Sequence, residues 1–320
     1  MKVNFSNYKL LINNLIFLDG IGRSGKRLLS RVCTSLENFE QYEFIEFFEN
    51  ILPGVALKKV SLDFAKSIII TTFNELAYNK FIGRKLNFRP SDVTTVKNFK
   101  NKNIYEKRLI MPEGDIVIKK LKKSKNFFPY MLHDLMVNFH LIEKMNFNFK
   151  IIEIYRNPFD SVFSSYNRGW GTRFLDDPRN FSLSLKYKNS LVPWYIFGNE
   201  KKWLKMNPVE RCTFNVLEMT NRQVKNHKRF QNNKKILTTS YENIVENTNK
   251  EISRICFFLK TKKTKYTEIM LAEEKCPKSI DRDKLEEKKK FIKSNITRTQ
   301  YKKLEDLTKK YEKNIYNLYI

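Results

Sequence analysis

Residues 20–27 (GIGRSGKR) have the composition of a phosphate-binding loop. The apolar run Leu15–Leu18 before them reads as a buried strand, and apolar residues between Leu28 and Leu36 have helical spacing. A loop at the N-terminus of a helix directs free backbone N–H groups at an anion, and the helix dipole adds to the attraction. The loop also carries three cations: Arg23, Lys26 and Arg27. We therefore expect a phosphate to bind here, the alternative being an ordinary basic turn before a helix.

The spacing of this loop matches a Walker A motif, Gly-x4-Gly-Lys-[Ser/Thr], except at the last position. Arg27 stands where a Ser or Thr hydroxyl would hold magnesium, and a cation there would repel the metal. This departure favours a protein that binds phosphate without magnesium. A kinase or ATPase that depends on a nucleoside triphosphate stays open as an alternative function.

A second candidate site for an anion lies between Arg156 and Ser164. Residues 150–155 read as a strand that delivers Arg156 to the edge of a sheet, and a helix is expected over residues 159–166. A guanidinium group suits bidentate recognition of phosphate, and the Ser164 hydroxyl, two turns into the helix, can complete the contact. The alternative for Arg156 is a salt bridge with Asp160.

The elements that would position both segments alternate between strands and helices. This alternation indicates an α/β fold with a central parallel sheet flanked by helices, in which residues 15–36 form a P-loop-type strand–loop–helix unit. Ligand sites in such sheets lie at the carboxyl ends of the strands, where both segments fall. Further strands are expected over residues 115–118 and 235–238, and further helices over 67–81, 132–145, 249–259 and 299–319.

Three segments, in this order, resemble the sulfotransferases that use 3′-phosphoadenosine 5′-phosphosulfate (PAPS). The first loop of that family, Arg/Lys-Ser-Gly-Thr-Thr/Ser, cradles the 5′-phosphosulfate, and residues 23–27 here read RSGKR. The second motif, Arg-[Asn/Asp]-Pro with a Ser eight residues after the Arg, holds the 3′-phosphate and is matched by Arg156 and Ser164. The third, Tyr-Glu-[Asp/Asn]-Leu, is similar to residues 239–245, TSYENIV. The resemblance spans roughly residues 14–262.

The resemblance implies transfer of a sulfuryl group from PAPS to a hydroxyl or amine, with no metal. Lys26 and Arg27 replace the usual pair of threonines, so a catalytically inactive relative that binds polyanions stays open as a further alternative. The residues that the resemblance implies for binding the nucleotide donor are Gly22, Arg23, Ser24, Gly25, Lys26, Arg27, Leu28, Arg156 and Ser164.

The resemblance also implies a catalytic base, commonly His or Glu. Cytosolic members carry Lys-Thr-His after a central strand, a place that residues 119–121 (KKL) take here, so we expect Lys119 to contact the transferring group. Branches similar to the Golgi tyrosylprotein sulfotransferases place a Glu about twenty residues after the first loop. Glu43 or Glu46 is the predicted base on that ground, with Glu49 as a further candidate.

Other residues near the predicted base also have expected roles. The acidic run that begins at Glu40 has three-residue spacing, so one acidic helix face is the alternative for these glutamates. His133 is expected to be a packed or exposed histidine. Arg23 is expected to stabilise charge that develops on the transferring group.

The acceptor could be a sugar, a lipid or a peptide tyrosine, and a carbohydrate or another hydroxyl compound is expected. The basic surface favours an acidic acceptor such as an anionic polysaccharide, and the stretch 278–293 could approach the nucleotide from the C-terminal side. Four aromatic residues could stack on a sugar ring or on adenine, or could equally belong to the core: Trp170, Trp194, Tyr195 and Trp203.

Composition bounds these predictions. The chain has 320 residues, a net charge of +27 and 41% apolar residues, which excludes a disordered chain. A chain so basic attracts anions, but it has no zinc-finger spacing, no basic region with heptads and no RNA-binding aromatic motif, so nucleic acid is not the expected partner. We expect one domain over residues 1–320, with a core over about 14–262 and a basic helical extension over 263–320.

The sequence also carries signals about location. Its four cysteines are far apart and form no CxxC pair, which favours a reducing compartment. No run of about 18 apolar residues occurs, so no transmembrane helix is expected. Residues 10–18 are interrupted by two asparagines and lack a cleavage site. We therefore expect a cytoplasmic protein.

Overall fold

The computed structural model describes residues 5, 9–173 and 182–316 of the chain. Its strands are β1 (Asn14–Asp19), β2 (Glu43–Phe44), β3 (Phe127–Met131), β4 (Lys150–Tyr155), β5 (Ser184–Tyr187), β6 (Ser190–Pro193) and β7 (Ile236–Ser240). Its α-helices are α1 (Lys26–Ser35), α2 (Glu46–Ala56), α3 (Leu62–Phe81), α4 (Lys102–Arg108), α5 (Asp115–Lys123), α6 (Phe139–Met145), α7 (Pro158–Asn167), α9 (Glu200–Leu204), α10 (Pro208–Phe230), α11 (Tyr241–Glu246), α12 (Thr248–Leu259), α13 (Lys265–Glu273), α14 (Arg282–Asn295) and α15 (Arg298–Tyr311). Short 3₁₀ turns are η1 (Val96–Asn98), η2 (Met136–Asn138) and η4 (Trp194–Ile196), and η5 (Glu312–Tyr316) is a π-helical turn.

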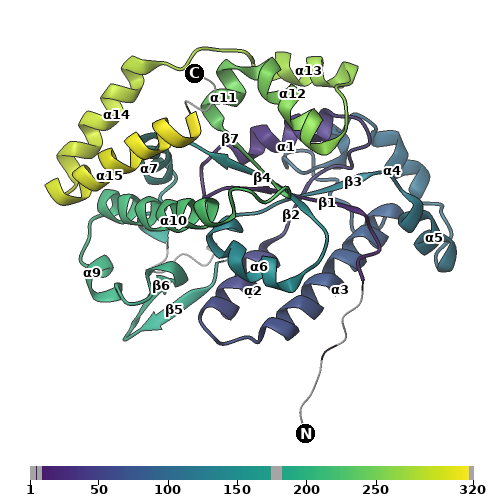
Figure 1. Ribbon diagram of the computed structural model, residues 1–320, viewed down its shortest axis with the longest axis horizontal. Coiled ribbons are helices and arrows are strands. Elements are labelled where there is room, and N and C mark those ends of the chain that lie inside the picture. Colours follow the sequence, from purple (N-terminus) through teal and green to yellow (C-terminus); the bar gives the residue numbers. More distant parts are fainter. Residues whose placement is uncertain (1–4, 6–8, 174–181, 317–320) are drawn as a thin grey trace, which may run out of the picture.

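Five parallel strands form the central sheet in the order β2-β3-β1-β4-β7. β1 lies in the middle, so Phe17 pairs with Tyr130 of β3 on one side and with Ile151 of β4 on the other. Because the pairing is parallel, the carboxyl ends of β1, β3 and β4 lie at one edge of the sheet. Figure 1 shows this sheet at the centre of the molecule, with helices around it. Three loops, which follow these three strands, converge at that edge.

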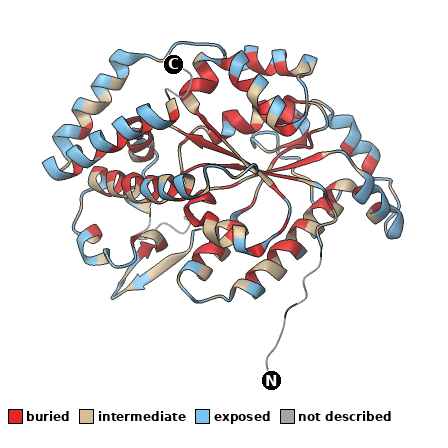
Figure 2. Cartoon of the chain, in the orientation of Figure 1, coloured by how far each residue is buried: buried red, intermediate tan, exposed pale blue. Residues whose placement is uncertain are grey.

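Both faces of the sheet are buried, as the red strands in Figure 2 show. Alternate residues of a strand point to opposite faces. Leu15 and Phe17 accordingly join the core formed with α2, α3 and α6, whereas Ile16 and Leu18 join the core formed with α1, α12 and α13. The predicted central parallel sheet flanked by helices is thus confirmed. The strands expected at 15–18, 150–155 and 235–238 are β1, β4 and β7.

One predicted strand is wrong. Residues 115–118 begin α5, because Val117 and Leu121, one turn apart, are buried on one face while the lysines between and after them face solvent. The central strand β3 is not predicted by the sequence patterns. Pro129 lies inside it and normally argues against a strand, but the neighbouring β2 is only two residues long and pairs with Tyr130 and Met131.

The predicted helices are present, but some of their ends differ from the prediction. The helix expected over 132–145 is a 3₁₀ turn followed by α6. The helix expected over 299–319 is α15 followed by the π-helical turn η5, and residues 317–319 lie outside the described ones. The basic segment after residue 263 packs through its apolar side chains: Ile292, Leu304 and Leu307 are buried in a cluster with Val216 of α10. Among the described residues, no helix is both long and apolar enough to cross a membrane.

Candidate functional site

The loop after β1 turns tightly under the N-terminus of α1. Gly25 has φ +100°, and a Cβ there would lie 2.6 Å from Cδ2 of Tyr241, so only glycine fits without a shift. Gly20 approaches β4 in the same way, because a Cβ would lie 2.4 Å from the Ile154 carbonyl oxygen. Arg23 also has a positive φ, of 69°. The loop follows the predicted strand–loop–helix pattern and directs the first N–H groups of α1 into the space before it.

Lys26 does not point into that space. Its buried ammonium donates to the Gly20 carbonyl at 2.6 Å and to the Ile21 carbonyl at 2.7 Å. Burial lowers the pKa of Lys26 to about 8, while the carboxyls of Asp134, Asp19 and Glu49 act in the opposite direction. The side chain therefore holds the loop from behind.

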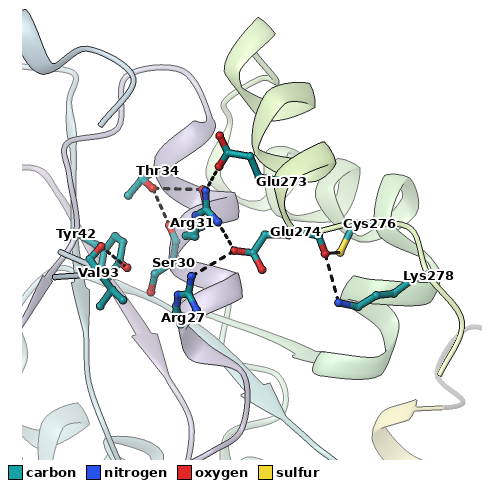
Figure 3. A network of polar contacts seen from close by, with 10 residues as sticks. All are labelled: Arg27, Ser30, Arg31, Thr34, Tyr42, Val93, Glu273, Glu274, Cys276 and Lys278. Atoms are coloured by element: carbon teal, nitrogen blue, oxygen red, sulfur yellow. Dashed lines mark hydrogen bonds and ion pairs between the residues drawn. The ribbon is translucent and has the colours of Figure 1, made fainter. Parts of the chain in front are cut away.

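Arg27 and Leu28 also turn away from the loop. The Arg27 side chain is 63% exposed and lies 3.8 Å from a carboxylate oxygen of Glu274, just after α13. Figure 3 shows Arg27 and Arg31 of α1 reaching toward Glu273 and Glu274. Leu28 is buried in the core, so it can offer only its backbone to a donor.

Arg23, Arg156 and Ser164 lie together, as the sequence predicts. Arg23 Nε donates to Ser164 Oγ at 2.8 Å, and Arg156 Nη1 donates to the Arg23 carbonyl at 3.2 Å. The Arg156 guanidinium also lies 4.7 Å from the ring centre of Tyr241. Burial and the nearby charges of Arg168 and Arg156 lower the pKa of Arg23. Guanidinium groups held this close favour a bound anion.

The alternative reading of Arg156 is wrong. Asp160, its expected salt-bridge partner, accepts a hydrogen bond from Lys288 of α14 at 2.6 Å. The segment after α13 runs beside α11, because the backbone N–H of Lys278 donates to the Val245 carbonyl.

A histidine and a glutamate face each other on the other side of the loop. His133 comes two residues after β3, and its Nδ1 lies 2.7 Å from Oε1 of Glu49 on α2. The backbone N–H of His133 donates to the same carboxylate. This pair, which we call the His133–Glu49 pair, brings together two segments separated by 84 residues. The sequence predicts a packed or exposed histidine at this position, because residues 132–145 have a helical pattern. In the structure His133 instead follows β3 and contacts Glu49.

Burial governs the titration of this pair. It lowers the pKa of His133 to about 3 and raises the pKa of Glu49 to about 8, the latter opposed by the charge of Lys26 and by the His133 N–H. The pair as a unit therefore has no net charge at neutral pH and loses one proton near pH 8. Above that pH, the carboxylate can accept from Nδ1–H and leave Nε2 free to take a proton.

The pair opens onto a cavity of about 270 Å³ next to the loop. Ile21 and Gly22 of the loop line it, and so do three aromatic residues: Phe44, Trp170 and Tyr195. Trp170 packs against the loop, since a Cβ at Gly22 would lie 2.2 Å from its ring. Trp194 and Trp203, in contrast, are buried in the core.

The predicted catalytic residues divide. Glu46 lines the cavity, whereas Glu43 pairs with the Lys80 ammonium at 2.5 Å and lies outside it. Lys119 is exposed on α5, a helix that lies at the edge of the molecule in Figure 1. Its predicted place beside the loop is wrong, because residues 115–118 are not a strand. Glu40, part of the acidic run, is buried against Arg108. Among the described residues, no group of three or more His, Cys, Asp or Glu side chains could hold a metal ion.

Comparison with solved structures returns sulfotransferases. The sulfotransferase domain of the Synechococcus PCC 7002 olefin synthase is 12% identical, with 97% of this chain and 98% of that chain covered and a TM-score of 0.48. Sulfotransferase STF9 from Mycobacterium avium is 12% identical over 95% of this chain and 78% of that one, with a TM-score of 0.46. Mouse sulfotransferase SULT7A1, solved with PAP, is 14% identical over 97% and 89%, with a TM-score of 0.41. No curated protein matches the sequence.

The family itself is shown by a sequence comparison. The model of the sulfotransferase domain matches residues 16–317, which include the loop after β1, the Arg156–Ser164 segment and the His133–Glu49 pair. The chain therefore belongs to the sulfotransferase domain family and is a transferase.

Proposed function

We propose that the protein transfers a sulfuryl group from PAPS to a hydroxyl group of an acceptor. The observation that carries the proposal is the contact of Arg23 with both Ser164 and Arg156, beside a cavity that holds the His133–Glu49 pair. The guanidinium groups of Arg23 and Arg156 suit the phosphate and phosphosulfate groups of the donor. The backbone N–H groups at the start of α1 suit the same anion. Gly22, Ser24, Gly25, Lys26, Arg27 and Leu28 complete the proposed donor site through backbone or loop geometry.

We assign the role of base to His133. Nε2 takes the proton of the acceptor hydroxyl as its oxygen bonds to sulfur, and the bond from sulfur to the donor phosphate oxygen breaks, which releases the 3′,5′-bisphosphate (PAP). Glu49 orients the imidazole through Nδ1. Arg23 stabilises the negative charge on the transferring group and its leaving oxygen. Glu46, predicted from the sequence as the base, lines the same cavity and is the second candidate for that role.

The acceptor is proposed to be a carbohydrate or another compact hydroxyl compound. Trp170, Phe44 and Tyr195 support this, since aromatic faces stack on sugar rings and on aromatic rings alike. The cavity is small for a long polysaccharide, so we expect one ring to enter it. The single domain over residues 1–320 and the cytoplasmic location stay predictions from the sequence.

The donor is tested by thermal unfolding with PAP, with ATP and magnesium, and with AMP. A ligand that binds only the folded protein raises the unfolding temperature by mass action. We expect PAP alone to stabilise the wild-type protein. Arg156→Ala should weaken PAP binding by roughly ten- to one-hundred-fold, the range for a hydrogen bond to a charged group.

The matched control is Arg84→Ala, which removes an exposed guanidinium that pairs with Glu113 away from the site and should leave PAP binding unchanged. Stabilisation by ATP and magnesium would instead favour the kinase alternative. Stabilisation by a polyanion but by none of the nucleotides would favour a catalytically inactive relative.

A further inference from the structure

Two loops of the site are tied to each other through their backbones. The Leu132 N–H donates to the carbonyl of Leu18, near the end of β1. The Asp134 N–H donates to the carbonyl of Gly20, the first residue after β1. Asp19 accepts from the N–H groups of Leu135 and Met136, at 2.9 and 2.8 Å. The segment that carries His133 is therefore held against the loop that follows β1.

Lys26 lies where these two segments meet. The Gly20 carbonyl accepts from both Lys26 Nζ and the Asp134 N–H, so one oxygen joins the α1 side chain to the residue next to His133. The Lys26 side chain is 5% exposed, and its second bond goes to Ile21, which lines the acceptor cavity. The family loop has a threonine at this position, whose short side chain could not reach both carbonyls.

Titratable groups from four segments surround the Lys26 ammonium. They are Asp19 of β1, Asp134 after β3, Glu49 of α2 and, with the same sign as Lys26, Arg23 of the loop. Glu49 in turn faces Lys26, His133 and Glu46. Lys26 is thus the cation that compensates buried carboxyls on both the donor side and the acceptor side of the site.

We infer that Lys26 is a positioning residue for the proposed transfer: its bonds to two carbonyls fix the donor loop and, through the shared Gly20 carbonyl, the segment that carries His133 of the His133–Glu49 pair. The inference rests on the proposed function for its catalytic meaning, although the coupling itself exists without turnover. In this arrangement the Lys26 ammonium stabilises the loop through its carbonyls, on the side away from the donor. The backbone N–H groups, Arg23 and Arg156 then bind the donor itself. Replacement of the family threonine pair by Lys26 and Arg27 is then compatible with an active site.

The test is the titration of His133 in the PAP-free protein, followed by NMR of the imidazole nitrogens. The chain has only three histidines, so His133→Gln assigns the signal. In the wild-type protein we expect the signal to change as the pair loses its proton near pH 8. A nearby cation favours the deprotonated carboxylate, and burial lowers the pKa of Lys26 to about 8, so the ammonium is partly charged at this midpoint. Lys26→Thr should therefore move the change upward by up to roughly one pH unit. Lys26→Arg keeps the charge and should restore most of the wild-type midpoint.

The matched control is Lys80→Thr. Lys80 is also buried, 2% exposed, and also donates to a carbonyl, that of Gln41 at 2.7 Å, but it lies on α3 beside Glu43. Lys80→Thr should destabilise the fold without moving the His133 midpoint. An unchanged midpoint in folded Lys26→Thr, or an equal shift in Lys80→Thr, would overturn the inference. If Lys26→Thr does not fold, Lys26→Gln, which can still donate to a carbonyl, replaces it in the same comparison. If PAP does not bind the wild-type protein, the proposed function is overturned, but the titration of His133 still tests the coupling to Lys26.

Discussion

At the scale of single residues, the site depends on partly buried polar groups that contact one another. His133 keeps 27% of its side chain exposed to the cavity and Glu49 20%, so burial is deep enough to favour neutral forms but leaves a path for an acceptor. Nε2 of His133 can take a proton from an acceptor only after Glu49 has lost its own proton. This sets the pH at which His133 can act as the base.

The first prediction concerns that pH. Because burial raises the pKa of Glu49 to about 8, the form with a free Nε2 is populated as the pH rises through 8. We expect kcat/KM for sulfuryl transfer to rise with pH through that range in the wild-type protein. Glu49→Gln removes the titrating carboxyl and should abolish this limb. His133→Ala should lower kcat by about 10²- to 10⁴-fold at every pH.

A control separates this effect from the titration of other groups. Glu286→Gln removes an exposed carboxylate of α14 that pairs with Lys289, and it should keep the wild-type pH profile. A rise through pH 8 that persists in Glu49→Gln would show that another group controls the limb.

At the scale of elements, the site is made by loops at the ends of β1, β3 and β4. Each loop makes a tight turn directly after its strand, and two of these turns contain residues with positive φ, namely Arg23, Gly25 and Asp134. The turns are possible because the strands on either side of β1 are fixed in register and buried on both faces. A rigid sheet can therefore present short and strained loops to a ligand.

The second prediction tests the first loop. Gly25→Ala adds a Cβ that would lie 2.6 Å from the Tyr241 ring, which itself packs against Arg156. We expect a loss of PAP affinity of at least about ten-fold, measured by calorimetry, because the loop and Arg156 must both shift. Gly114→Ala is the matched control, since Gly114 also has a positive φ, of 92°, but a Cβ there meets nothing within 4 Å.

Both variants carry the backbone cost of a non-glycine residue at positive φ, about 1–3 kcal/mol. Only Gly25→Ala should also affect the nucleotide. Equal PAP affinity in the two variants would indicate that the space beside Tyr241 is not part of the donor site.

At the scale of the whole molecule, a buried ion pair attaches the segment between α3 and β3 to the core. Arg108 of α4 binds both carboxylate oxygens of Glu40, at 2.7 and 2.9 Å, and both side chains are almost fully buried. Tyr105 and Asn126 donate to the same carboxylate. Burial alone would raise the pKa of Glu40, but the bonds and charge of Arg108 hold that pKa below its usual value. The pair therefore stabilises the fold only while Glu40 is ionised.

The third prediction follows from this pair. Arg108→Met leaves a buried carboxylate without its cation and should lower the free energy of unfolding by about 3–5 kcal/mol at pH 7.5, measured with urea. Because the folded pKa of Glu40 is lowered, the wild-type protein has this stabilisation above the unfolded pKa and loses it as the pH falls through the folded one. The difference between the two proteins should shrink in acid.

The double variant Glu40→Gln/Arg108→Met is the control for this third prediction. It removes both charges and should recover part of the lost stability. A double variant no more stable than Arg108→Met would mean that the loss comes from packing of the Arg108 side chain.

Local patterns in the chain were enough to predict the α/β class, β1, β4, β7 and the two segments that bring Arg23, Arg156 and Ser164 together. These features depend on the alternation of apolar runs and on cations placed directly after them, which short segments contain. The direction of the Lys26 ammonium, the pairing of Asp160 with Lys288 and the exposed position of Lys119 could not be predicted in this way. The His133–Glu49 pair joins α2 to the loop after β3. Pro129 lies inside β3, and a proline is not typical of a central strand. Such contacts depend on which strands are neighbours in the sheet, and that order is set by packing between distant segments rather than by any segment itself.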